Sequence, residues 1–248
     1  MIRILFGART WKKLIPPAIG VSLLGLAVSP MALAQTRKAE AKPVAAQTAA
    51  EPLKAIGSKS APITMEVFSD YQCPSCRTLF EQTLRPMIND YVAAGKVYLV
   101  HRDFPLPMHR YSHDAARWVN AAAKIGKYPE VEAALYDNQN AWSADGNIEK
   151  YVAGALTSAE LKRVEKIMEG CQADAPGVKP AKLSGAAQAG QGCSVDGAIE
   201  KDVALGRLVP VNSTPTYIFV YKGQRYPPAS GIVSWPILKQ FFDQLLSQ

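Results

Sequence analysis

Phe68-Ser69-Asp70-Tyr71-Gln72-Cys73-Pro74-Ser75-Cys76 is the stretch that decides the fold, because it joins an apolar strand-like segment, 63–68, to the start of a helical pattern. With Pro74 as the first helical residue, Cys73 lies at the helix entrance, where unpaired backbone N–H groups and the helix dipole favour a thiolate. We therefore expect Cys73 to be the attacking sulfur and Cys76, one turn further on, to be the shielded resolving thiol.

The segments around this motif predict an α/β fold. Apolar residues recur at helical spacing from Phe80 to Tyr91, Gly95 ends that helix, and residues 97–100 are typical of a second strand. A strand, a helix and a strand in this order predict parallel pairing with a right-handed crossover. A mostly helical block follows, then a strand over 216–221, a short strand around Arg225 and a final amphipathic helix after Ser234.

The N-terminal segment predicts export. Four basic residues and no acidic one precede an apolar run, 14–33, that ends in Ala32-Leu33-Ala34. We interpret residues 1–34 as a cleaved signal peptide, with an uncleaved membrane anchor as the alternative, against which three prolines argue. Residues 35–60, rich in Ala, Lys, Pro and Gln, are expected to form a flexible tether. A weak self-associating helix over 39–50 is the alternative for that segment, and the folded domain is expected over 61–248.

Charge and cysteine content narrow the class of protein. The whole chain carries a net charge of +7, but four of the positive charges lie in the leader, which leaves about +3. No basic run interleaved with aromatic residues occurs elsewhere, so nucleic-acid binding is not expected. Four cysteines in an exported chain indicate an oxidising compartment, periplasmic or otherwise extracytoplasmic.

Three motifs together resemble one family. They are Phe68 to Cys76, the later Asn212-Ser213-Thr214-Pro215-Thr216-Tyr217 and, more weakly, Phe104-Pro105-Leu106-Pro107-Met108-His109. Over roughly Pro62 to Leu246 the chain resembles the DsbA-like branch of the thioredoxin-fold oxidoreductases. The resemblance implies a thioredoxin fold with an all-helical insertion, about 104–207, between the second and third strands. It also implies that the Thr214–Pro215 peptide bond is cis and faces Cys73, where the backbone at Thr214 can pair with an extended substrate.

The same resemblance implies an enzyme that exchanges dithiols and disulfides in exported proteins through the redox-active Cys73-Pro74-Ser75-Cys76 motif. Disulfide formation is the favoured direction, which implies reoxidation by a quinone-linked membrane partner, DsbB-like or vitamin K epoxide reductase-like. An isomerase or reductase kept reduced by a membrane electron source is the alternative. Ser75 stands where strongly oxidising members usually have His, and a neutral hydroxyl predicts a milder oxidant.

Two further features concern the remaining cysteines and the histidines. Cys171 and Cys193 bracket a loop rich in Gly, Ala and Pro, so a structural disulfide is our first choice, worth about 3 kcal/mol by the chain-entropy estimate. Two free thiols or a second redox pair are the alternatives. His109 and His113 are expected in surface or helix-entry roles. We expect no cofactor and no metal site, and a non-enzymatic carrier binding copper at Cys73 and Cys76 is the remote alternative.

Overall fold

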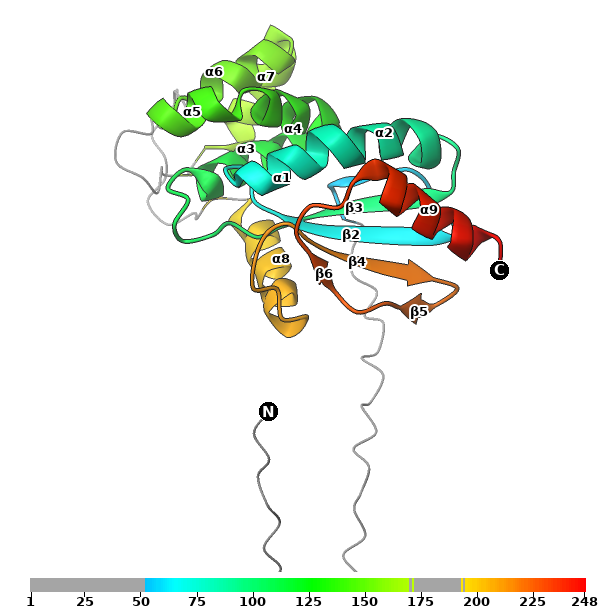
Figure 1. Cartoon of the computed structure of the whole chain (residues 1–248). Helices are drawn as coiled ribbons and strands as arrows, with labels where there is room; N and C mark the ends of the chain where they lie inside the picture. The colour runs from blue at the N-terminus through cyan, green and yellow to red at the C-terminus, as the bar shows by residue number, and fades with distance from the viewer. Residues whose placement is uncertain (1–51, 170, 172–192, 194) are drawn as a thin grey trace, which may run out of the picture. The chain divides into compact units, whose positions relative to one another are not determined.

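The fold is built on one mixed sheet (Figure 1), and this computed structural model describes residues 52–169, 171, 193 and 195–248. The strands are paired in the order β1–β3–β2–β4–β5, and β6 also pairs with β4. Their bounds are Ala55–Ile56 for β1, Ile63–Ser69 for β2, Val97–Asp103 for β3, Thr216–Tyr221 for β4, Gln224–Arg225 for β5 and Ala229–Ser230 for β6.

Strand β2 is the centre of the sheet and carries the active-site motif at its end. It runs parallel to β3, with Ile63 opposite Val97, and antiparallel to β4. Met65 and Phe68, which point to opposite faces of β2, are both fully buried. A strand that is buried on both sides needs a helical layer on each face of the sheet.

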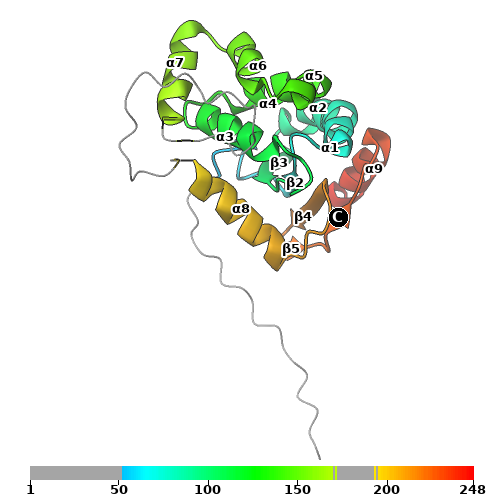
Figure 2. The same cartoon turned by 90° about the vertical axis from the view of Figure 1, so that its left-hand side faces the viewer.

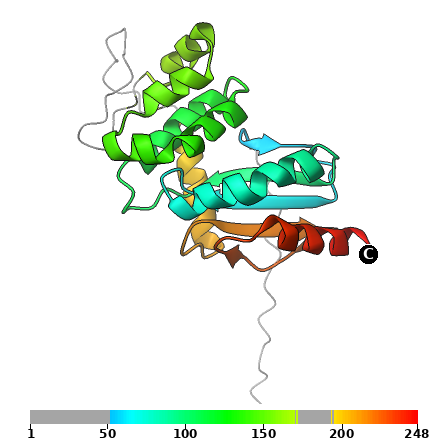
Figure 3. The ribbon, with the colours of Figure 1, turned by 45° about the horizontal axis from the view of Figure 1, so that its top comes forward.

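The first layer is the helix that follows β2, together with the C-terminal helix. The helix runs through α1 (Pro74–Leu79), α2 (Arg85–Met87) and two π-helical segments, η1 (Phe80–Leu84) and η2 (Ile88–Val92). Gly95 follows it with a φ of 68°, the left-handed conformation in which helices often end. Figure 3 shows this helix beside α9 (Trp235–Leu246) on one side of the strands. The hydroxyl of Tyr91 donates to Asp243 and joins the two helices.

The helical insertion occupies the chain between β3 and β4, as predicted. Figure 2 shows most of its helices gathered together, with the last one in the chain extending away from the others. They are α3 (Ser112–Ala123), α4 (Tyr128–Asp137), α5 (Gln139–Asp145), α6 (Ile148–Ala155), α7 (Ser158–Ile167) and α8 (Asp196–Leu208). The capping box at the start of α7 is present, because Thr157 accepts from the Glu160 N–H and the Glu160 carboxylate accepts from the Thr157 N–H.

Helix α8 supplies the second layer. It contacts β3, and its Leu205 packs against a small apolar cluster that contains Phe68, Val211 and Ile218. A Cβ atom at Gly206 would lie 2.6 Å from the ring of Phe104, so only glycine allows α8 to approach this closely. The absence of a side chain at Gly206 therefore positions α8 against the end of β3.

The tether expected to extend to residue 60 ends earlier, which corrects the predicted domain boundary. Ala55 and Ile56 form β1, which pairs antiparallel with β3, and Lys54 is only 3% exposed. The composition of this segment does not predict the strand, because two residues at a sheet edge give almost no periodic pattern. The rest of the predicted tether, 35–51, and the predicted signal peptide lie outside the described residues. Within the described part of the chain, no helix has both the length and the apolarity needed to cross a bilayer.

Candidate active site

The two cysteines of the motif lie at the entrance of α1. Cys73 is the N-cap residue in extended conformation, with Pro74 in the first turn. Its carbonyl accepts from the N–H groups of Cys76 and Arg77 at 3.1 and 3.2 Å. This geometry directs the unpaired N–H groups of the first helical turn toward the sulfur of Cys73.

The surroundings of the two thiols shift their pKa values in opposite directions. Both are free in this structure, with Cys73 6% and Cys76 1% exposed. The pKa of Cys73 is lowered to about 5, and the first cause is a hydrogen bond from the Cys76 thiol. Burial opposes this shift, whereas the Thr214 side chain and the backbone N–H groups of Cys76 and Ser75 add to it. Burial, and then the proximity of Cys73, raises the pKa of Cys76. Near neutral pH, Cys73 is therefore a thiolate and Cys76 a thiol.

The loop before β4 faces Cys73. The Thr214–Pro215 peptide bond is cis, and the Sγ of Cys73 lies 3.4 Å from the carbonyl oxygen of Thr214. The buried Thr214 hydroxyl has no hydrogen-bond partner within the described part of the chain while Cys73 is a thiol, so it is available to donate to a thiolate. The Thr216 hydroxyl donates to the carbonyl of Ser213 at 2.7 Å and fixes the same loop.

Asp70 connects the motif to the segment after β3. Its buried carboxylate accepts from the N–H groups of Gln72 and Leu106 at 2.7 and 2.8 Å. It also contacts Nδ1 of His109 at 2.7 Å and accepts from the hydroxyl of Ser112 at 2.5 Å. Four hydrogen bonds to one carboxylate hold two loops together beside Cys73.

The helical insertion also holds the motif directly. Gln139, the first residue of α5, is 2% exposed and donates to the carbonyls of Tyr71 and Cys73 at 2.7 and 3.0 Å. Ser69, whose side chain helps to lower the pKa of Cys76, lies 2.8 Å from the hydroxyl of Tyr136 in α4. The insertion is therefore part of the site and does more than cover the sheet.

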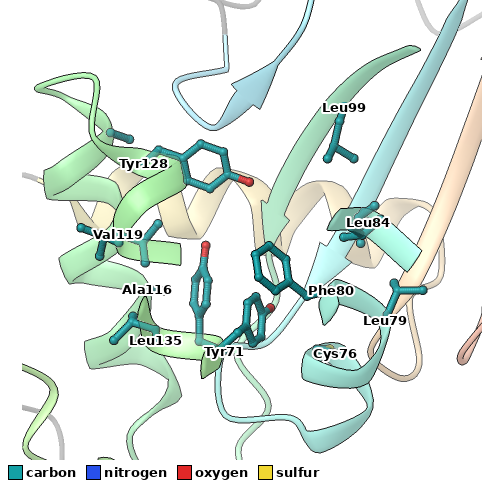
Figure 4. Packing of buried hydrophobic residues seen from close by; sticks show 14 of the residues in the cluster. Tyr71, Cys76, Leu79, Phe80, Leu84, Leu99, Ala116, Val119, Tyr128 and Leu135 are labelled. Atoms are coloured by element: carbon teal, nitrogen blue, oxygen red, sulfur yellow. The ribbon is translucent and has the colours of Figure 1, made fainter. Parts of the chain in front are cut away.

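An aromatic cluster fills the space behind Cys76. Figure 4 shows Tyr71 and Phe80 between α1 and the insertion, where Tyr128 also points inward. The ring of Tyr71 stacks on His101 with centroids 5.0 Å apart, and Phe80 stacks on Tyr136 at 4.8 Å. These rings keep water from the inner thiol, which explains why desolvation is the first cause of its raised pKa.

One cluster of buried charged side chains lies beside β1 and β3. Val67, in the middle of β2, is apolar and only 1% exposed. The ammonium of Lys54 pairs with Asp103 and lies 3.2 Å from Asp202 and 3.1 Å from the side-chain oxygen of Asn120. This cluster ties β1, β3, α3 and α8 together.

The other two cysteines form a disulfide, Cys171–Cys193, that joins the chain after α7 to the chain before α8. Among the described residues, no group of three or more His, Cys, Asp or Glu side chains is arranged to hold a metal ion. The copper alternative would therefore depend on the Cys73 and Cys76 thiols alone.

The sequence predicts the cysteines and the Thr214–Pro215 loop as site residues, but it does not predict the residues that hold them. Asp70 and His109 were both within the quoted motifs, yet His109 was assigned a surface or helix-entry role. Their pairing joins residues 39 positions apart, and no local pattern encodes such a contact. Gln139 had no signal at all, because a single buried amide in a helical block resembles a surface residue.

The fold and the pair of thiols at a helix entrance define a thioredoxin-type protein. The thioredoxin family matches residues 49–227, and the chain belongs to that family. No curated protein matches the sequence. The expected membership of the thioredoxin family is thereby confirmed.

The fold of the chain is also similar to that of several solved structures. The chain is similar to alpha-DsbA1 of Wolbachia pipientis, with 16% identity and a TM-score of 0.59 over 78% of this chain and 90% of that one. It is similar to oxidised BdbD of Bacillus subtilis, with 16% identity and a TM-score of 0.56 over 78% and 92%. It also matches DsbA2 of Pseudomonas aeruginosa, with 20% identity and a TM-score of 0.50 over 80% and 97%. The DsbA-like fold is therefore confirmed.

Proposed function

We propose that this protein is an exported thiol:disulfide oxidoreductase that donates the Cys73–Cys76 disulfide to cysteines of other exported proteins. The proposal rests on the difference between the pKa values of the two thiols. The pKa of Cys73 is lowered to about 5, and that of Cys76 is raised. A stabilised thiolate favours the reduced form of the pair, and a disulfide whose reduced form is stabilised is a good oxidant.

The geometry supports a two-step exchange. A substrate thiolate attacks the Sγ of Cys73, the Cys73–Cys76 bond breaks, and Cys76 leaves and takes up a proton. A second substrate thiolate then attacks the substrate sulfur of the mixed disulfide and releases Cys73 as a thiolate. Two electrons pass from the substrate dithiol to the protein, and the substrate gains one disulfide. Because its pKa is low, Cys73 is a good leaving group in the second step.

The Thr214 carbonyl is positioned to align the substrate. It lies 3.4 Å from the Sγ of Cys73, and Pro215 has no N–H that would compete for an incoming backbone. An extended substrate segment can donate its N–H to this carbonyl by β-augmentation, with its cysteine beside Cys73. Recognition through the backbone accepts many sequences, as an oxidant of diverse exported proteins requires.

Location and reoxidation belong to the same proposal. The predicted signal peptide, 1–34, and the even number of cysteines support a periplasmic or otherwise extracytoplasmic protein. Each turnover leaves two electrons on Cys73 and Cys76, so an oxidase needs an acceptor. A quinone-linked membrane partner, DsbB-like or vitamin K epoxide reductase-like, would supply it.

An isomerase or reductase is the second candidate function. The neutral Ser75 favours it, because the pKa of Cys73 at about 5 lies between the values of about 3.5 and 7 typical of a strong oxidant and of thioredoxin. In that direction Cys73 attacks a substrate disulfide and Cys76 resolves the mixed disulfide.

Turnover on an unfolded substrate tests the proposal. Oxidised mature protein is mixed with a reduced, unfolded protein that has two cysteines, and free thiols are counted over time. We expect one substrate disulfide for each Cys73–Cys76 disulfide consumed, and none from a variant with Cys73→Ser and Cys76→Ser. No transfer from the wild-type disulfide, together with tight stoichiometric binding of copper by the reduced protein, would replace this proposal with the metal-carrier alternative.

A further inference from the structure

His109 is a titratable group beside the exchange site to which the mechanism above gives no role. It lies in the segment between β3 and α3, and its side chain is 20% exposed. Its Nδ1 contacts the Oδ2 of Asp70 at 2.7 Å, and the Asp70 side chain is fully buried. A buried carboxylate on one ring nitrogen fixes the orientation of the imidazole and leaves Nε2 as the nitrogen that exchanges its proton.

The same aspartate holds Cys73. The backbone carbonyl of Asp70 accepts from the N–H of Cys73 at 3.1 Å, so one residue positions both the nucleophile and the histidine. The hydrogen bond with Asp70 is the first cause of a raised pKa of His109. Burial opposes this shift, and the charges of Asp70 and Cys73 add to it. Because electrostatic coupling is reciprocal, a protonated His109 favours the Cys73 thiolate to the same extent that the thiolate favours the imidazolium.

We propose that His109, oriented by Asp70, is a positioning residue of the exchange reaction that gains a proton when Cys73 and Cys76 are reduced and loses it when they form a disulfide. This inference rests on the proposed exchange at Cys73 and Cys76 and adds a group that couples it to pH. It also supplies a positive charge near Cys73 that the neutral Ser75 cannot provide.

The charged surroundings of His109 support an electrostatic role. Asp70 and Cys73 are the groups whose charges act on its pKa. The neighbouring Arg110 places its guanidinium 5.2 Å from the centroid of the Tyr111 ring. Ser112, which shares the Asp70 carboxylate, is neutral. Oxidation removes the negative charge of Cys73 and leaves the other groups unchanged, so the redox state of the pair is the variable that His109 senses.

The proton balance gives this inference a quantitative signature. At a pH between the pKa values of Cys73 and Cys76, the Cys73–Cys76 disulfide reacts with two glutathione thiols. The products are one glutathione disulfide, the Cys73 thiolate, the Cys76 thiol and one released proton. The equilibrium constant for this reaction then rises about tenfold for each pH unit. Where His109 takes up part of that proton, the rise is smaller than tenfold. A histidine with a purely structural role leaves the tenfold dependence unchanged.

Two measurements on the full mature protein test the proposal. The first is the titration of the His109 ring by NMR in the reduced and the oxidised states, which needs no turnover. We expect the pKa of His109 to be higher in the reduced state than in the oxidised state. Equal values for His109 in the two states would overturn the proposal even if the disulfide exchanges normally. Failure of the proposed function would be visible separately, as a wild-type disulfide that does not equilibrate with glutathione.

The second measurement is the glutathione equilibrium between about pH 6 and pH 7.5, below the ordinary pKa of a thiol. In His109→Gln the amide can still donate to Asp70 but carries no charge. We expect the pKa of Cys73 to rise by roughly half a unit to one unit in this variant, and the equilibrium constant for reduction to fall by roughly three- to tenfold. At pH values about one unit or more above the raised pKa of Cys73, its pH dependence should become tenfold per unit, whereas His113→Gln should behave as the wild type.

Adding Ser75→His to the His109→Gln variant separates charge from structure. It restores a cation beside Cys73 without restoring the Asp70 contact of an imidazole, and we expect it to lower the pKa of Cys73 again. Loss of the charge effect in His109→Gln with no recovery in this double variant would indicate a structural role and overturn the inference.

Discussion

The Sγ of Cys73 lies 3.4 Å from the carbonyl oxygen of Thr214, a residue 141 positions later in the chain. Thr214 therefore acts on the nucleophile in two ways. Its carbonyl lies where an incoming substrate backbone can pair, and its side chain stabilises the thiolate that the exchange releases. Substrate alignment and leaving-group stability both depend on the loop that ends at the cis bond to Pro215.

Replacing Thr214 by Val removes the hydroxyl while it keeps the shape of the side chain. Since the side chain of Thr214 lowers the pKa of Cys73, we expect Thr214→Val to raise that pKa by about half a unit to one unit. The ultraviolet absorbance of the thiolate, followed against pH in the reduced protein, measures the shift. Thr216→Val is the matched control, because Thr216 bonds to Ser213 and Ser230 instead of the sulfur. An equal shift in both variants would contradict the assigned role of Thr214.

The difference between the two thiols predicts opposite outcomes for the single cysteine variants. Cys76→Ala removes the thiol that lowers the pKa of Cys73 most, but it leaves Cys73 at the helix entrance without its resolving partner, so mixed disulfides with substrate or glutathione should accumulate. Cys73→Ala leaves only Cys76, which is 1% exposed and has a raised pKa, and should form almost none. Mass spectrometry under non-reducing conditions counts the adducts. Comparable adduct formation by both variants would show that the roles of the two cysteines are assigned wrongly.

The low pKa of Cys73 predicts how the stability of the reduced protein depends on pH. The folded pKa of about 5 is depressed from the ordinary value of 9.0, so the thiolate contributes stability that is complete above the unfolded pKa and is lost as pH falls through 5. The oxidised protein has no such contribution. We expect the free energy of unfolding of the reduced form, relative to the oxidised form, to rise from pH 5 toward neutrality.

Urea unfolding of both redox forms at several pH values measures this difference. The opposite slope, or no slope, would mean that Cys73 is not a stabilised thiolate in the folded protein.

Lys54 makes the earlier domain boundary testable. Its ammonium is buried with the carboxylates of Asp103 and Asp202, and Lys54→Met would take this cation from Asp103 while Asp202 keeps its ion pair with Arg102. We expect a loss of about 3–5 kcal/mol in the free energy of unfolding, the usual cost of breaking a buried ion pair on one side. The exposed neighbour of Asp202 provides a control, Lys201→Met, that should change little. A protein that begins at Gly57 lacks Lys54 and β1 and should be at least as unstable as Lys54→Met.

The parts of this structure that the sequence predicts are those with local signals. The thiol motif, the helix ended by Gly95 and the amphipathic C-terminal helix each have a periodic pattern or a characteristic turn residue. The predicted hairpin strand near Arg225 is present as β5, but β6 was missed because Ala229 and Ser230 form a strand only through their pairing with β4.

The rest of the site depends on contacts between distant segments. Asp70 and His109 are ordinary surface residue types, and only the fold shows that they form a pair beside Cys73. Lys54 belongs to a segment whose composition favours a tether, yet its buried charge is compensated by residues 49 and 148 positions away. Polar residues of this kind are buried because the tertiary structure provides partners, and that information is not contained in a local pattern.

The reduction potential of the Cys73/Cys76 couple tests the central claim most directly. The measurement uses mature protein equilibrated in glutathione buffers, with Cys171 and Cys193 replaced so that only one couple reports. We predict a potential between about −180 and −120 mV, in the range of disulfide donors. A potential of roughly −230 mV or below would contradict the oxidase account and would assign the protein to the reductases or isomerases.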